Sequence, residues 1–414
     1  MVDLALEDIN VLDFSQGISG PYCTKLMSDL GARIIKVERP DGGDIARHMG
    51  PFLNDNPHLE TSGSFLALNS NKFGITLNLR TEAARKIARQ LIGWADIIVE
   101  SFRPGVMEHF SLDWMHAQQL KPELVYTSIS NFGQSGPYRN YRSSEIIAYA
   151  MGGEMYSTGL DGLEPLKLGG TVSLFQAGSI AAIATLGALF VSRDQNVGQQ
   201  VDISIMEALI ANQDRRAPGL LAYQYTGEVT TRLPYGSTAY PMGIYQCKDG
   251  YFELMAGLVR FQGAVRMLGN PDWLQDPKWH TTTAQSDPDL KEEFNVHFRS
   301  WCLKYTKQEL WELAQDNRVL SGPVNDISDV MNDPVLNQRG SFAEIEHPFV
   351  GTLKYPGRPF RMTGSPSLLD ADGPQGQKNI RPAPTLGQHN QEVICDMLNY
   401  SPTELIRLRE QRVI

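Results

Sequence analysis

Short apolar runs alternate with amphipathic segments along the first half of the chain. The runs that have the composition of buried strands are Ile9–Phe14, Arg33–Val37, Ile75–Leu79, Asp96–Glu100, Leu124–Ser130 and Gln200–Ile205. Helical periodicity separates them, most clearly at Pro21–Leu30 and Thr81–Trp94. Apolar strands that alternate with helices are typical of a parallel sheet covered on both faces. The pattern therefore predicts an α/β fold with its ligand site at the carboxyl ends of the strands.

The pattern changes after about residue 213. Residues 233–243 (LPYGSTAYPMG) are rich in turn formers and indicate a linker, and the Asp-Gly turn at 249–250 predicts a hairpin. Further helices are predicted at 258–268, 290–301, 307–316 and 390–398. We therefore expect a large domain made of residues 1–215 and 330–414, with a smaller α+β domain of residues 216–329 inserted between its two parts.

Composition and charge narrow the class of ligand. The 414 residues carry a net charge of −10, which disfavours nucleic acid and anionic membranes as partners but allows a small anion in a local basic pocket. The four cysteines lack metal-site or disulfide spacing, and the acidic start of the chain lacks the basic residues of a signal peptide. The longest apolar helix-like run, Ile180–Val191, is shorter than the roughly 20 residues that span a bilayer. We therefore expect a cytoplasmic protein.

Seven stretches of the sequence resemble one enzyme family in their residues, order and spacing. They are VLDFSQGISGPYCTKLMSDLGARIIKVERPDGGDIAR (11–47), NSNKFGITLNL (69–79), ADIIVESFRPG (95–105), LVYTSISNFGQSGPY (124–138), MGGEMYSTGLDG (151–162), GQQVDISIMEAL (198–209) and TLGQHNQEVI (385–394). With these motifs the chain resembles the family III CoA-transferases, the group that contains formyl-CoA transferase and carnitine CoA-transferase. No GxGxxG motif follows a strand, which disfavours the alternative of a dinucleotide-dependent dehydrogenase.

The resemblance implies a fold, a reaction and a mode of assembly. Family members have a Rossmann-like large domain with a smaller inserted domain, and two subunits thread through each other as an interlocked dimer. They move CoA from one carboxylic acid to another, so CoA and acyl-CoA are substrates and no cofactor is bound permanently. None of the eight histidines has the HxxxH spacing of a metal site, and no metal is expected.

Three basic residues match loop positions that are commonly basic in this family. They are Arg39 in KVERP, Lys72 in NSNK and Arg103 in SFRPG. Each could instead be a solvated surface charge or the partner of a nearby acid. Because all three are expected at the ends of successive parallel strands, they are our candidates for binding the phosphates of CoA.

The nucleophile of the family is missing from its expected position. In the family, an Asp attacks the acyl-CoA thioester to give a mixed anhydride and CoA thiolate, and the thiolate then forms an aspartyl-CoA thioester. That Asp lies four residues before a Gly that opens a helix of small residues, which is Gly178 here. The ungapped count gives Leu174, and the nearest acids, Asp161 and Glu164, lie ten or more residues upstream. The resemblance thus implies that a hydrocarbon side chain replaces the nucleophile.

Glu145 is a second candidate for the reaction centre. The family often has an acidic or polar residue seven positions before the first Gly of its GG pair, which is Glu145 here. This carboxylate could orient acyl groups, or it could stabilise the start of a helix at Ile146–Ala150 through the helix dipole. The related α-methylacyl-CoA racemases have a His at the position of Ser144, and without that His and the Asp a racemase is not expected.

Three hypotheses follow for the function. In the first, the chain is the non-catalytic subunit of a heteromeric CoA-transferase whose paralogous partner keeps the Asp, an arrangement similar to that of the succinyl-CoA:benzylsuccinate CoA-transferases. In the second, it is a self-sufficient transferase, for example a homodimer, that uses another carboxylate such as Glu145. In the third, it binds CoA without transferring it. We favour the first, because an interlocked dimer tolerates one half that has lost its nucleophile.

Overall fold

The chain forms two compact units. The computed structural model describes residues 4–211, 216–229, 232, 239–365 and 380–414, so most of the predicted linker at 233–243 lies outside the described residues. The first unit consists of Met1–Thr158, Leu166–Thr230 and Gln338–Ile414, and the second of Gly159–Pro165 and Thr231–Asn337. The predicted domain boundaries near residues 215 and 329 stay a prediction. Compact units show which segments pack together in the folded chain, and they do not show which segments fold as independent domains.

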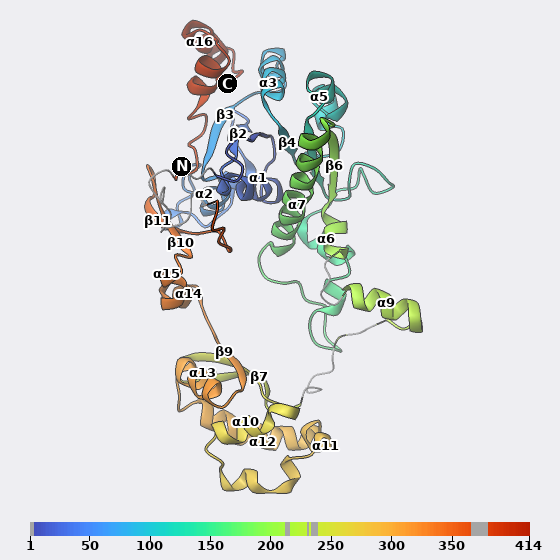
Figure 1. Ribbon diagram of the computed structural model, residues 1–414, viewed down its shortest axis with the longest axis vertical. Helices are drawn as coiled ribbons and strands as arrows, with labels where there is room; N and C mark the ends of the chain where they lie inside the picture. The colour runs from blue at the N-terminus through green and yellow to red at the C-terminus, as the bar shows by residue number, and fades with distance from the viewer. Residues whose placement is uncertain (1–3, 212–215, 230–231, 233–238, 366–379) are drawn as a thin grey trace. The chain divides into compact units, whose positions relative to one another are not determined.

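A six-stranded parallel sheet forms the centre of the first unit (Figure 1), which confirms the predicted α/β fold. Its strands are β1 (Asn10–Asp13), β2 (Arg33–Glu38), β3 (Lys72–Thr76), β4 (Ile97–Glu100), β5 (Val125–Ser130) and β6 (Gln199–Ser204). Their order, β3-β2-β1-β4-β5-β6, is that of a doubly wound sheet. The strand order reverses between β1 and β4, and doubly wound sheets bind their ligands outside the carboxyl ends of the strands at this point.

Helices cover both faces of this sheet, because successive residues of a strand point to opposite faces. Val11 of β1 belongs to a core shared with α1, α6, α7 and α8, whereas Leu12 belongs to a core shared with α3, α5 and the last helices of the chain. The helices of this unit are α1 (Ser19–Asp29), α2 (Gly63–Asn69), α3 (Glu82–Trp94), α4 (Val106–His109), α5 (Trp114–Leu120), α6 (Glu145–Met151), α7 (Val172–Gln195), α8 (Ile205–Ile210), α9 (Arg216–Thr226), a π-helix (Glu392–Met397) and α16 (Pro402–Glu410).

The second unit is a small antiparallel sheet packed against helices. Its sheet has the order β7-β8-β9, and β7 and β8 form the hairpin that the Asp-Gly turn predicts. Its elements are β7 (Met242–Cys247), β8 (Gly250–Met255), β9 (Leu320–Val324), α10 (Phe261–Met267), α11 (Thr282–Gln285), α12 (Pro288–Cys302), α13 (Lys307–Asp316) and α14 (Ile327–Asn332). After α15 (Pro334–Gln338), the chain returns to the first unit, where the hairpin of β10 (Phe342–His347) and β11 (Gly351–Pro356) packs with α2.

Two elements near the predicted site differ from the sequence pattern. Strand β3 covers Lys72–Thr76 rather than Ile75–Leu79, because the Lys72 side chain is buried beside a carboxylate and a hydropathy pattern counts it as exposed. Helix α7 begins well before the predicted run Ile180–Val191. Among the described residues it is the one helix long and apolar enough to cross a membrane, but its inner face packs in the core of the first unit.

Helix α16 is absent from the sequence prediction. Ser401 and Glu404 form a capping box at its start, with Pro402 in the first turn, a combination that favours helix initiation. Leu405 and Leu408, three residues apart, are buried in the core beneath β1 and β3. The short apolar face explains why periodicity alone did not reveal this helix.

Charged side chains are buried where β1, β2 and β3 lie side by side. Lys72 of β3 forms an ion pair with Asp13 of β1 at 3.1 Å and donates to the Thr24 hydroxyl at 2.7 Å. Lys36 of β2 forms an ion pair with Asp44 at 2.7 Å, and both pairs are fully buried. Burial alone would raise the pKa of Asp13, but Lys72 and Lys36 lower it to about 2. Burial lowers the pKa of Lys72 to about 8, so the pair is ionised at neutral pH.

A lone buried carboxyl group lies at the end of β4. Glu100 is 4% exposed and accepts the backbone N–H of Phe102 at 2.7 Å. Burial raises the pKa of Glu100 to about 7, against hydrogen bonds from the Ser128 hydroxyl and the Phe102 amide, while Asp202 raises it further. This carboxyl group therefore shapes the start of the loop that carries Arg103.

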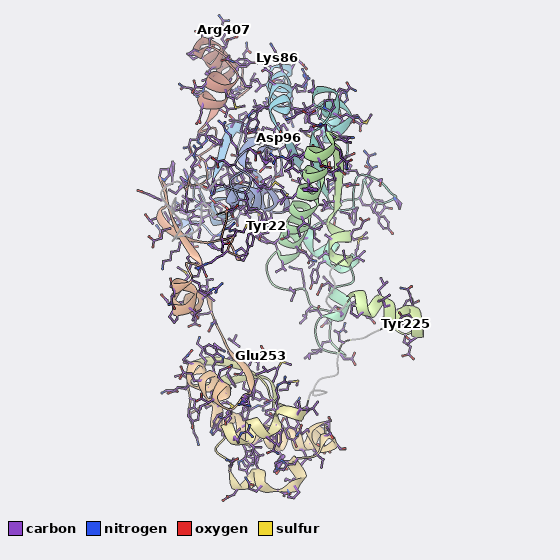
Figure 2. The ribbon with its side chains drawn as sticks, in the orientation of Figure 1. Tyr22, Lys86, Asp96, Tyr225, Glu253 and Arg407 are labelled. Carbon is purple, nitrogen blue, oxygen red and sulfur yellow. The ribbon has the colours of Figure 1, made fainter. Side chains whose placement is uncertain are left out.

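We predict that Lys72→Met lowers the free energy of unfolding by about 3–5 kcal/mol, because Asp13 then keeps a buried charge without its partner. Urea denaturation at pH 7 measures the change. Lys86→Met, at an exposed position of α3 (Figure 2), is the control and should stay within about 0.5 kcal/mol of the wild type. A Lys72→Met protein as stable as the control would contradict the prediction.

We also predict a pH dependence of stability that arises from Glu100. Its folded-state pKa of about 7 lies above the ordinary value of 4.5, so its contribution to stability is complete below pH 4.5 and is lost as the pH rises through 7. Relative to Glu100→Gln, the wild type should lose about 1–3 kcal/mol between pH 4.5 and 8. Denaturant unfolding across this range tests the prediction, with Glu108→Gln as an exposed control; equal slopes for the wild type and Glu100→Gln would refute it.

Candidate functional site

The loops after β1 and β4 are joined at the reversal point of the sheet. Phe14 donates its backbone N–H to the carbonyl of Val99 at 2.8 Å. Gln16 donates its backbone N–H to the hydroxyl of Ser101 at 2.8 Å, and this hydroxyl donates back to the Gln16 carbonyl at 3.2 Å. These bonds hold the two loops together at the place where a doubly wound sheet binds its ligands.

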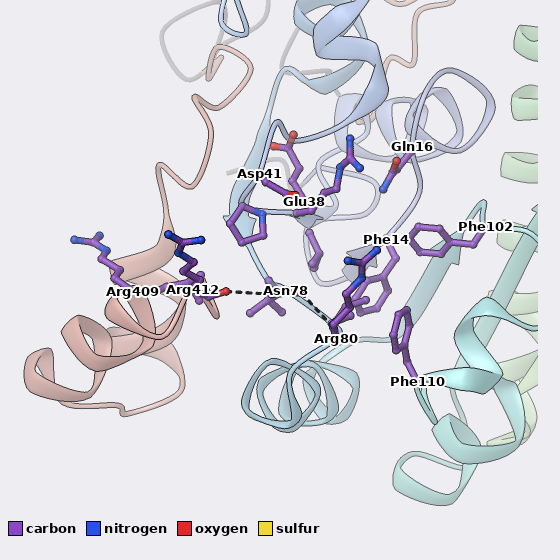
Figure 3. A pocket seen from close by; sticks show the side chains of 16 residues that line it. Phe14, Gln16, Glu38, Asp41, Asn78, Arg80, Phe102, Phe110, Arg409 and Arg412 are labelled. Atoms are coloured by element: carbon purple, nitrogen blue, oxygen red, sulfur yellow. Dashed lines mark hydrogen bonds between the residues drawn. The ribbon is translucent and has the colours of Figure 1, made fainter.

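A cavity of 760 Å³, which we call the arginine cavity, adjoins this junction (Figure 3). Its lining residues are Phe14, Gln16, Val37, Glu38, Arg39, Pro40, Asp41, Leu77, Asn78, Leu79, Arg80, Phe102, Phe110, Arg409, Arg412 and Ile414. The four arginines come from the loops after β2 and β3 and from α16 with the residues that follow it. Glu38 is already paired with Arg47 at 2.7 Å, which leaves the Asp41 carboxylate against four arginines, so this cavity is locally basic in a chain of net charge −10.

A second cavity, of 560 Å³, which we call the Leu174 cavity, shares Gln16 and Phe102 with the first. Its lining residues are Gln16, Gly17, Ile18, Ser19, Ile45, Met49, Ser101, Phe102, Arg103, Pro104, Val106, Ile129, Ser130, Asn131, Arg139, Asn140, Tyr141, Thr171, Leu174 and Ile205. The two cavities therefore adjoin at Gln16 and Phe102.

The structure separates the three predicted phosphate-binding residues. Arg39 is exposed in the arginine cavity, with its Nε donating to the carbonyl of Gly43 at 3.1 Å, and Arg103 is exposed in the Leu174 cavity. Lys72 lines neither cavity and lies at the start of β3, so its expected position at a strand end is wrong. Phosphate binding by Lys72 stays a prediction, one that requires its ammonium group to leave Asp13 and the Pro21 carbonyl.

Leu174 lies in the first turn of α7 and lines the cavity that bears its name. Gly178, one turn later, packs closely against α1, since a Cβ there would lie 2.6 Å from the carbonyl oxygen of Ser19. Residues four apart share a face of a helix, so Leu174 lies on the face that packs toward α1. The close packing of α1 and α7 therefore fixes the position of the Leu174 side chain at the wall of the cavity.

Glu145 begins α6 and lines neither cavity. It forms an ion pair with Lys167 at 3.0 Å and accepts a hydrogen bond from the Ser173 hydroxyl. The contact with Ser173 places this carboxylate beside the start of α7, one residue from Leu174. The structure is compatible with both hypotheses for Glu145. It lies in the first turn of a helix, where it can stabilise the helix dipole, and it is close to the predicted reaction centre, where it could orient acyl groups.

Four arginines of the two cavities were not among the predicted site residues. Arg80 lies in the loop after β3 and directly follows the predicted strand Ile75–Leu79, so its position at a strand end was already visible in the sequence. Arg139 follows β5 in the SGPYR loop, and its Nε is buried without a hydrogen-bond partner within the described residues. Arg409 and Arg412 come from the end of the chain, and nothing in the local sequence indicates that they approach β3.

The two cavities can bind anions but offer few groups for proton transfer. The residues that line the Leu174 cavity include no carboxylate, imidazole, thiol or ammonium group. Guanidinium groups such as those of Arg103 and Arg139 bind carboxylates and phosphates in two-pronged geometry. Within the ranges that the structure describes, no cluster of His, Cys, Asp and Glu could hold a metal ion.

Comparisons of the sequence with known proteins point to one enzyme family. The family model described as CoA-transferase family III matches residues 6–390. The chain is 31% identical to succinyl-CoA–D-citramalate CoA-transferase of Chloroflexus aurantiacus, over 99% of this chain and 98% of the relative. It is 30% identical to formyl-CoA:oxalate CoA-transferase of Streptomyces avermitilis, over 99% of both chains.

A solved structure is similar over nearly the whole chain. The crystal structure of a CAIB/BAIF family protein from Brucella suis superposes with a TM-score of 0.83 at 25% identity, covering 95% of this chain and all of the other. The fold, the two adjoining cavities and the full-length matches lead to one assignment. The chain belongs to CoA-transferase family III, whose enzymes move CoA between an acyl-CoA and a carboxylic acid.

Proposed function

We propose that this chain is the non-catalytic subunit of a heteromeric family III CoA-transferase, made with a paralogue that supplies the nucleophilic Asp. One observation carries this proposal: Leu174 occupies the expected position of the nucleophile, and no residue that lines the Leu174 cavity is a carboxylate. The family reaction needs a side chain that can become an anhydride and then a thioester. A leucine can do neither, and the arginines, serines and asparagines around it cannot replace it.

The two cavities suggest how CoA is held. The nucleotide of CoA would occupy the arginine cavity, where cations and the rings of Phe102 and Phe110 are available for phosphates and adenine. The pantetheine arm would pass Gln16, which both cavities share, and bring the thioester into the Leu174 cavity. Arg39 would then bind the phosphates of CoA, and so would Arg103, which directly follows the shared residue Phe102.

A partner chain has apolar surface available on α7. Ile183 and Phe190 are 72% and 77% exposed on this helix, far more than core residues. An apolar cavity of 740 Å³ lies between α1, α2, α7 and residues 355–360. Exposed apolar surface of this kind favours association, and we propose that a paralogue covers it in an interlocked dimer. The four cysteines are free, which suits a reducing cytoplasm.

Glu145 supports a second candidate, a self-sufficient transferase. Its hydrogen bond with Ser173 puts a carboxylate next to the position of the missing Asp. To act as nucleophile, Glu145 would have to break its ion pair with Lys167 and turn toward the Leu174 cavity. The first candidate requires no such rearrangement, and the two differ in whether the chain alone forms a covalent intermediate.

We predict that Arg39→Ala and Arg103→Ala each weaken CoA binding by about tenfold or more, because each removes a charge-assisted contact worth roughly 1.5–3 kcal/mol. Isothermal titration calorimetry with CoA measures the loss. Arg89→Ala, on α3 outside both cavities, is the control and should bind as the wild type does. Unchanged affinity in both cavity variants would refute this placement of CoA.

We predict that the chain alone forms no covalent adduct with acyl-CoA, because the position of the nucleophile holds a hydrocarbon. Loss of a covalent nucleophile lowers the rate by several powers of ten, about 10⁶ in a well-studied hydrolase. Mass spectrometry after incubation with several acyl-CoAs tests this, with hydroxylamine to trap thioesters. An adduct on Glu145, Asp161 or Glu164 would overturn the heteromer proposal, whereas activity that needs an Asp-bearing paralogue would support it.

A further inference from the structure

We propose that Arg409 and Arg412 form a subsite for the 3′-phosphate of CoA, so that the segment after α16 distinguishes CoA from dephospho-CoA. The inference rests on the proposed function in taking CoA as the ligand of the arginine cavity. It adds two binding residues from a segment far from the other cavity residues in sequence. Figure 3 shows the two side chains extending in the same direction from the end of α16.

The guanidinium groups of this cavity are largely without partners. Within the described residues, the side chains of Arg80, Arg409 and Arg412 take part in no hydrogen bond and no ion pair. On the neighbouring helix α3, by contrast, Arg85 and Arg89 both pair with one carboxylate. Cations gathered around one cavity repel each other unless an anion neutralises them. The cavity therefore has the charge of a site for a multiply charged anion.

The backbone at Arg412 is unfavourable for an arginine. Helix α16 ends in a Schellman motif, in which Val413 donates to the Leu408 carbonyl at 2.8 Å and Arg412 donates to the Arg409 carbonyl at 2.9 Å. Arg412 has a φ of 55°, in the left-handed region where this motif usually has a glycine. An arginine at such a position, against its conformational preference, points to a role in binding.

Asn78 fixes this segment against the loop after β3. Its backbone N–H donates to the Val413 carbonyl at 2.7 Å, and its side-chain amide donates to the Arg412 carbonyl at 3.2 Å. Its side-chain oxygen accepts the backbone N–H of Arg80 at 3.3 Å (Figure 3). Asn78 thus fixes the backbone of Arg80 and of Arg412, the two sides of a basic surface formed by Arg80, Arg409 and Arg412. Arg412 therefore extends from a backbone held by hydrogen bonds.

The order of the strands assigns this surface to the 3′-phosphate. The residues shared with the Leu174 cavity follow β1 and β4, Arg39 follows β2, and Arg80 follows β3 at the sheet edge. Neighbouring strands are about 4.8 Å apart, so Arg412, bound to the loop after β3, lies roughly two strands from that junction. In CoA, the diphosphate follows the pantetheine arm and the 3′-phosphate on the ribose lies beyond it. The two sequences of groups match when Arg409 and Arg412 receive the 3′-phosphate.

The test compares CoA with dephospho-CoA, which lacks only the 3′-phosphate. Titration calorimetry with the intact chain should show that the wild type prefers CoA, and that Arg409→Ala and Arg412→Gly each reduce CoA affinity about tenfold while leaving dephospho-CoA affinity unchanged. Arg412→Gly suits the left-handed backbone, so its melting temperature should not fall. Arg407→Ala, on the same helix outside the cavity (Figure 2), is the matched control and should keep the preference.

The outcomes separate this inference from the proposed function. Equal affinity of the wild type for CoA and dephospho-CoA would overturn the inference and leave CoA binding intact. An Arg412→Gly protein that loses affinity equally for both ligands, or for neither, would also overturn it. If the wild type binds neither ligand, the proposed function itself fails. A preference for CoA that disappears in the two cavity variants but persists in Arg407→Ala would establish the subsite.

Discussion

The buried ion pairs at the centre of the parallel sheet are the constraint on which the rest of the structure depends. Asp13 lies on β1, and the lysines that surround it come from β2 and β3, so these charges join three neighbouring strands. Charges buried this deeply cost much free energy unless they are paired. Any other register of β1, β2 and β3 would separate the pairs, so electrostatics adds to hydrophobic packing in selecting this register.

The same charges shape the loops that make the site. The partner of Lys36 is Asp44, which lies in the loop after β2 and accepts the backbone N–H of Gly17 at 2.8 Å in the loop after β1. Glu38 binds Arg47 from that same loop. Buried polar contacts therefore fix the loops at the carboxyl edge of the sheet, and these loops line the two cavities. The Arg39 guanidinium, which donates only its Nε to the Gly43 carbonyl, forms no ion pair within the described residues, because Lys36 and Arg47 are the partners of Asp44 and Glu38.

The two cavities differ in the chemistry of the side chains that line them. The arginine cavity is lined by four arginines, and Leu174, which packs at the edge of the core, lines the adjoining cavity. In the function that we propose, affinity for CoA comes from the arginine cavity and reactivity from one side chain in the first turn of α7, so binding and chemistry are separable. The proposed heteromer would allow one subunit to bind CoA without carrying the nucleophile.

The sequence by itself determined the alternation of strands and helices, the α/β class and the family, because these follow from local hydrophobic periodicity and from motifs that are contiguous in the chain. It pointed to Arg39, Arg103 and Leu174 as candidates, and each of them lines one of the two cavities. It misplaced Lys72, because a pattern of hydropathy cannot show that a lysine is paired inside the core. Only the tertiary structure brought Arg409 and Arg412 beside Arg80: the contact joins residues more than 300 positions apart through Asn78, and long-range contacts of this kind leave no periodic trace in sequence.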